Sequence, residues 1–200
     1  MKRKILALAT ALALALSLSI CAFAAENQPP AGSDLALAQQ LNQLGLFRGA
    51  GTNADGSVNY DLDRQPNRAE GITMLVRALG AGDQEGTTKQ HPYQDVPTWA
   101  NGAVSYARKY DLTRGISATE FGAKSPVTTA MYLTFMLRAL GYQDGTDFVW
   151  NSPWETAVQA GILPAQADWA TLTRGELVEI TAVFREIFEK AQTLLRGIGL

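Results

Sequence analysis

The architecture of the chain is set by two short motifs, Asn67-Arg68-Ala69-Glu70 and, shortly after it, Val76-Arg77-Ala78-Leu79-Gly80. Both parts recur later in the chain. The first returns as Thr173-Arg174-Gly175-Glu176, and the second as Leu137-Arg138-Ala139-Leu140-Gly141. Recurrence of both a helix start and a helix end predicts a repeat architecture.

The two tetrads are typical helix starts. In a capping box, the first side chain accepts a hydrogen bond from the third helical amide, and a glutamate reaches back to the amide of the cap. Asn67 with Glu70, and Thr173 with Glu176, fit this pattern. Capping therefore accounts for these four residues without any ligand.

Apolar residues at helical spacing extend from these starts and predict two helices in each of three units. The units cover about residues 33–80, 93–141 and 147–195, each with a loop between its helices. The expected helices span about 33–44, 67–79, 100–110, 128–140, 152–160 and 173–194. The sequence thus predicts a mostly α fold of three helix-loop-helix repeats.

The arginines at the second tetrad position, Arg68 and Arg174, are not explained by capping. A cation in the first turn faces the positive end of the helix dipole, which costs about 0.3–1 kcal/mol. An arginine offers a planar fork for a carboxylate or phosphate, and free helix amides favour the same anion. An ion pair with Asp61 or Asp63 is the open alternative. On the ligand interpretation, removing either arginine should cost little stability.

The chain resembles S-layer homology repeats, three of which commonly form one wall-anchoring unit. The features that carry the resemblance are Tyr93-Gln94-Asp95-Val96-Pro97, the pair Trp99-Ala100 and the two tetrads. The resemblance covers about residues 35–189. It implies a pseudo-threefold helical bundle with loop prongs and with grooves between neighbouring repeats.

In that family the grooves hold a secondary cell-wall polysaccharide, often bearing pyruvate ketals, and the tetrad arginine faces the acidic sugar. The resemblance therefore implies ligand-binding roles for Asn67, Arg68, Glu70, Trp99, Thr173, Arg174 and Glu176. The second repeat departs from the pattern, because Thr129 and Met131 replace the arginine and the glutamate. At most two grooves should keep the charged contact. A degenerate scaffold that binds another envelope protein is the alternative function.

Enzymatic function is not expected. The only histidine is His91, which we expect to be an exposed loop residue, and the only cysteine is Cys21. Neither a catalytic group, a metal site nor a cofactor is predicted, and the loop around Asn53 to Ser57 does not fit an EF-hand. The net charge of −2 argues against a nucleic-acid partner.

The first residues predict export. Lys2-Arg3-Lys4 precedes an apolar run over residues 5–20, and Ala22 and Ala24 are the small residues of a cleavage site. We expect a signal peptide over residues 1–24 and a module over residues 25–200 without a stable membrane span. An uncleaved anchor is the alternative. The expected location is secreted, at the cell wall or cell surface.

Overall fold

The computed structural model describes residues 34–82, 89–164 and 171–197, and within these ranges it is mostly helical. The predicted signal peptide and its cleavage site lie outside the described residues. Six α-helices and one short 3-10 helix are present in the described ranges: α3 (Asp34–Gln43), α4 (Arg68–Ala78), η2 (Thr98–Ala100), α5 (Asn101–Lys109), α6 (Thr129–Ala139), α7 (Trp154–Gln159) and α8 (Arg174–Gly197). All six predicted α-helices are confirmed. Within these ranges, none is both long and apolar enough to cross a membrane.

The predicted caps set the helix starts. Asn67 Oδ1 accepts from Glu70 N at 2.9 Å, and Glu70 Oε2 accepts from Asn67 N at 2.8 Å, which completes a capping box on α4. Thr173 and Glu176 exchange the same two bonds at the start of α8. Both predicted capping boxes are confirmed.

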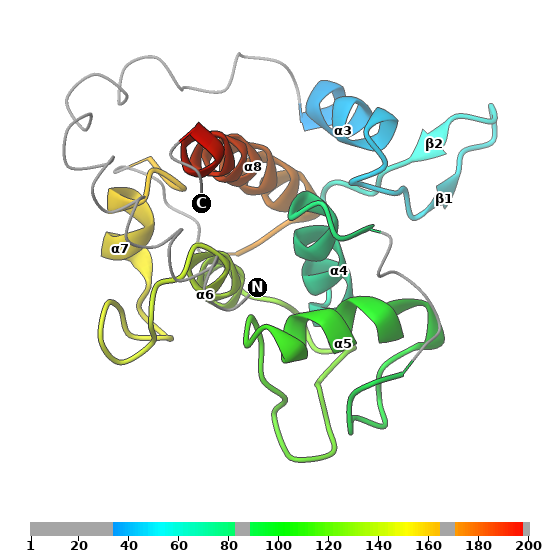
Figure 1. Ribbon diagram of the computed structural model, residues 1–200. Helices are drawn as coiled ribbons and strands as arrows, with labels where there is room; N and C mark the ends of the chain where they lie inside the picture. The colour runs from blue at the N-terminus through cyan, green and yellow to red at the C-terminus, as the bar shows by residue number, and fades with distance from the viewer. Residues whose placement is uncertain (1–33, 83–88, 165–170, 198–200) are drawn as a thin grey trace.

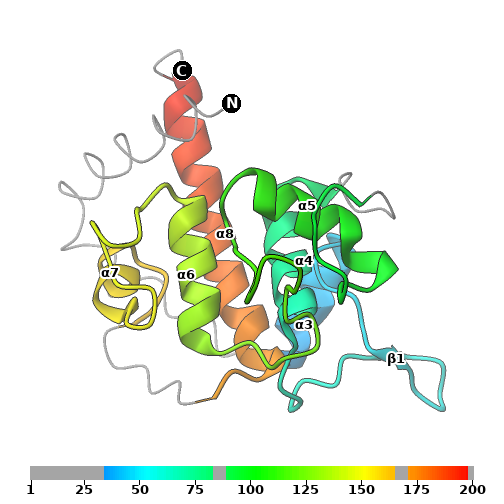
Figure 2. The same ribbon diagram turned by 90° about the horizontal axis from the view of Figure 1, so that it is seen from below.

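Helix α8 lies at the centre of the bundle, with α3, α4 and α6 around it and α7 beside α6 (Figure 1). It also extends well beyond the end of α6 (Figure 2). The core between these helices is dominated by large side chains with almost no exposure: Ile72, Leu75, Tyr132, Leu133, Leu137, Leu177 and Phe184. The hydroxyl of Tyr132 pairs with Thr181 Oγ1 at 2.7 Å, which satisfies the polar group within this core.

Two features differ from the sequence-based expectations. A two-stranded hairpin, β1 (Gly51–Thr52) with β2 (Val58–Asn59), projects from the loop expected between the first two helices, where no strand was predicted (Figures 1 and 2). His91 was expected to be exposed, and this is wrong: it is 7% exposed, bonds to Asn101 Oδ1 at 3.1 Å and stacks on Tyr93. Burial lowers its pKa.

Candidate functional site

Arg68 is buried, and its guanidinium group holds the loop that precedes α6. Its Nε donates to the carbonyl of Phe121 at 3.1 Å, and its Nη2 donates to the carbonyl of Arg114 at 2.9 Å. The guanidinium carbon lies 4.8 Å from the ring centre of Phe121. Only 6% of Arg68 is exposed. Its donors therefore bond one buried and one partly buried carbonyl from a distant part of the chain.

Arg174 makes the matching contacts with the loop that precedes α4. Its Nε donates to the carbonyl of Tyr60 at 2.9 Å, and its Nη2 donates to the carbonyl of Arg48 at 3.1 Å. Its guanidinium carbon lies 4.7 Å from the ring centre of Phe47. Arg174 differs from Arg68 in one respect, because its Nη1 also donates to Glu70 Oε1 at 3.2 Å. Burial lowers the pKa of both arginines.

The first amides of both helices are occupied by the same loops. Arg68 N donates to the carbonyl of Ser125 at 3.0 Å, and the next amide donates to the carbonyl of Ala123 at 3.2 Å. At α8, Arg174 N and Gly175 N donate to loop carbonyls in the same way, each at 2.9 Å. The premise that free helix amides could help to bind an anion is therefore wrong here.

These contacts also contradict the expectation that the arginines contribute little to folding. Each arginine donates hydrogen bonds to two loop carbonyls. A buried carbonyl left without a partner costs about 1–3 kcal/mol. The ion pair with Asp61 that was considered for the tetrad arginines is made instead by Arg64, whose Nε lies 2.7 Å from Asp61 Oδ2.

Asp95 was named in the sequence as part of the Asp-Val-Pro motif, but its role was missed. Its carboxylate accepts from the amides of Phe121, Gly122 and Ala123 at 2.7–2.8 Å. Burial alone would raise the pKa of Asp95, but the three amides outweigh burial and lower it. The loop over residues 121–123 is thus held on one side by Asp95 and on the other by the start of α4.

A groove of about 410 Å³ lies where α4 and α8 meet the loop over residues 47–50. We call it the α4–α8 groove. Trp99 contributes a side chain that is 51% exposed, whereas Arg174 and Thr73 contribute nearly buried ones. The lining residues are Phe47, Arg48, Gly49, Ala50, Pro66, Glu70, Thr73, Met74, Arg77, Trp99, Arg174 and Leu177. Three arginines and one glutamate therefore line a concave surface beside an exposed indole ring.

Glu70 is the acidic centre of this groove. Arg64 Nη2 lies 2.6 Å from Glu70 Oε1, and Arg174 Nη1 reaches the same oxygen. Burial alone would raise the pKa of Glu70, but hydrogen bonds from Arg64 and from Asn67 N outweigh it and lower the pKa. Glu70 is therefore ionised at neutral pH and orients two of the nearby guanidinium groups.

The structure brings together only part of the predicted ligand set. Glu70, Trp99 and Arg174 line the α4–α8 groove, whereas Asn67, Thr173 and Glu176 are engaged as helix caps. Arg68 lies at the other junction, beside α6. There Met131 occupies the place that Glu70 has beside Arg174, and Arg68 Nη1 faces its sulfur at 3.7 Å.

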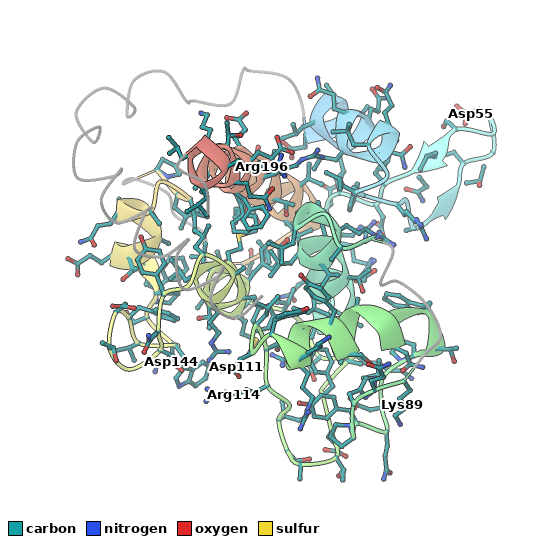
Figure 3. The ribbon with its side chains drawn as sticks, in the orientation of Figure 1. Asp55, Lys89, Asp111, Arg114, Asp144 and Arg196 are labelled. Carbon is teal, nitrogen blue, oxygen red and sulfur yellow. The ribbon has the colours of Figure 1, made fainter. Side chains whose placement is uncertain are left out.

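The junction beside α6 is charged but internally paired. Arg138 Nη2 lies 3.0 Å from Asp144 Oδ2, and Arg114 Nη2 lies 3.3 Å from Asp111 Oδ2. Figure 3 shows Asp111, Arg114 and Asp144 gathered at this edge of the molecule. The hydrogen bond to Asp111 raises the pKa of Arg114, and the charge of Asp144 adds to this. Across the described parts of the chain, no three His, Cys, Asp or Glu side chains form a group suited to a metal ion.

No protein-family model matches the chain. It is 34% identical over 97 residues to a cell surface protein of Thermoanaerobacter kivui, covering 46% of this chain. It is 32% identical over 139 residues to the middle cell wall protein of Brevibacillus brevis, and 34% identical over 137 residues to a surface layer protein of Brevibacillus choshinensis; each match covers 64% of this chain. The matched regions make up only 12–13% of these three proteins.

Proposed function

We propose that the chain is a non-catalytic module at the cell surface that binds an acidic, pyruvate-bearing polysaccharide of the cell wall in the α4–α8 groove. The observation that carries the proposal is the set of side chains in this groove: Arg48, Arg77 and Arg174 beside an exposed Trp99. The partial similarity to cell-wall and surface-layer proteins supports a structural role at the envelope.

The chemistry of the groove suits a sugar that bears a carboxylate. Arginine binds carboxylates through two parallel N–H donors, and such charge-assisted bonds are stronger than neutral ones. A large exposed ring such as that of Trp99 offers an apolar face with a polar edge, which suits the C–H face of a sugar. In this proposal Arg174 and Trp99 contact the ligand, and Glu70 holds Arg174 in place.

We further propose that the three units are repeats related by a pseudo-threefold axis, with boundaries near 33–80, 93–141 and 147–195. Hydrogen bonds at matching places support this. After each first helix, an amide donates to the carbonyl five residues earlier: Leu46 to Leu41 at 2.9 Å, Leu112 to Ala107 at 2.8 Å and Ile162 to Ala157 at 2.9 Å. The Arg68 and Arg174 contacts then tie one unit to the loop of another.

The experiment compares Trp99→Ala with Trp150→Ala in sedimentation with purified cell-wall sacculi. Trp150 is a matched control, because it is 52% exposed and lies outside the α4–α8 groove. An aromatic contact contributes about 0.5–1.5 kcal/mol, so Trp99→Ala should weaken binding about two- to tenfold. Trp150→Ala should bind like the parent protein.

Sacculi stripped of their polysaccharide should no longer bind the parent protein. If they bind it equally well, the polysaccharide is not the ligand. The alternative, a degenerate scaffold that contacts another envelope protein, is favoured by the internal ion pairs that Arg138 and Arg114 make at the other junction. It predicts equal sedimentation of both tryptophan variants with intact sacculi.

A further inference from the structure

One buried hydroxyl in the α4–α8 groove has no use within the described protein. Thr73 is 2% exposed, and its Oγ1 has no hydrogen-bond partner in the described parts of the chain. It lines the groove together with Trp99 and Arg174. A hydroxyl that loses water without gaining a partner destabilises the fold, so its presence at a groove wall requires an explanation.

A second threonine, Thr134, occupies a matching position in the chain, and there the fold uses the hydroxyl. Thr134 follows the cap of α6 by the same number of residues as Thr73 follows the cap of α4. Both threonines are buried. Thr134 Oγ1, however, donates to the carbonyl of Trp150 at 2.8 Å. The two sites thus differ in whether the protein itself satisfies the hydroxyl.

The nearby arginines are paired with carboxylates at both sites. At the α6 site, Arg138 pairs with Asp144, and Trp150 N donates to the other oxygen of that carboxylate. The protein therefore fills the α6 site with its own carboxylate and carbonyl. At the α4 site, Glu70 pairs with Arg174, whereas no group of the described chain bonds the hydroxyl of Thr73, which is left for another molecule.

We infer that Thr73 is a specificity-determining residue of the α4–α8 groove, where its hydroxyl bonds a hydroxyl or ring oxygen of the bound sugar. This inference rests on the proposed polysaccharide function. The acid group of the ligand lies at the guanidinium groups of the arginines that line the groove. The sugar unit that carries this acid group, or the neighbouring sugar unit, lies between Thr73 and Trp99. The groove thus selects for a hydroxyl pattern as well as for negative charge, and the α6 site does not bind this ligand.

The test compares Thr73→Val with Thr134→Val, since valine keeps the shape of threonine and removes its hydroxyl. The probe is wall polysaccharide released from purified sacculi, with binding measured by titration calorimetry and folding by thermal unfolding. Thr73→Val should lower the affinity about two- to tenfold, the range for one hydrogen bond, and should not lower the melting temperature. Thr134→Val should lower the melting temperature and leave the affinity unchanged. Thr73→Ser should retain the parent affinity.

Each outcome decides a separate question. If Thr73→Val binds like the parent while Trp99→Ala binds more weakly, the role of Thr73 is refuted and the polysaccharide function stands. If Thr73→Val lowers the melting temperature as Thr134→Val does, its hydroxyl serves the fold and the inference fails. If the parent protein binds no released polysaccharide, both the proposed function and the role of Thr73 fail.

Discussion

Replacement of Arg68 by alanine should strongly destabilise the fold. The substitution leaves the buried carbonyl of Phe121 without its donor. It also removes the shorter of two hydrogen bonds to the carbonyl of Arg114, which Thr113 Oγ1 contacts at 3.4 Å. One unsatisfied buried carbonyl costs about 1–3 kcal/mol. The lost bond to the Arg114 carbonyl and the lost packing on the Phe121 ring add to this. We expect a total of about 3–5 kcal/mol, a large share of the 5–15 kcal/mol that stabilises a typical domain.

The measurement is urea and thermal unfolding followed by circular dichroism. For a domain of this size, a loss of about 3–5 kcal/mol lowers the melting temperature by roughly 10 °C. Arg114→Ala is the control, because its side chain is 66% exposed and its ion pair with Asp111 is a surface pair. Such pairs contribute about 0–1 kcal/mol. If Arg68→Ala and Arg114→Ala unfold at the same denaturant concentration, the structural role of Arg68 is wrong.

Two further substitutions test the network and its pH dependence. Met131→Glu should raise the unfolding free energy by about 1–2 kcal/mol in urea titrations, because it completes a capping box with Thr128 and gives Arg68 an acidic partner; an unchanged midpoint would contradict this. Burial, and then the nearby Asp34, raise the pKa of the Glu179 carboxyl group from 4.5 to about 7. The folded state therefore binds the proton of this carboxyl group more tightly than the unfolded state does. Stability should therefore fall as the pH rises from about 4.5 to 7, and Glu179→Gln should unfold at a higher temperature than the parent at pH 8; a parent-like pH profile in this variant would exclude Glu179 as the cause.

The sequence predicted the elements that local chemistry determines. Reciprocal caps at Asn67 and Thr173 and left-handed glycines at Gly80 and Gly141 define helix ends without any information from distant residues. Helices α4, α6 and α8 were found for this reason, and apolar residues at helical spacing predicted the other three. The hairpin of β1 and β2 was missed because its strands are only two residues each and carry no alternating pattern.

The candidate site was predicted only in part, because its roles depend on contacts between distant segments. Trp99 and Arg174 were named, but nothing in the sequence showed that they would line one groove. Arg68 is separated from its acceptor Phe121 by 53 positions. Thr73 and Thr134 look alike in sequence, and only the position of the carbonyl of Trp150 distinguishes them.

A cation in the first turn is unfavourable for the helix dipole, but in this protein loop carbonyl oxygens lie at the start of both helices and bind the arginines. The positive end of α4 faces carbonyl oxygens of the neighbouring loop, and Arg68 extends the same array of donors with its guanidinium group. Arg174 does this at α8, and there the array also forms one wall of the α4–α8 groove. Substitution of Arg174 therefore changes folding and binding together. Only residues that line the groove without holding a loop, such as Trp99 and Thr73, can separate the two effects.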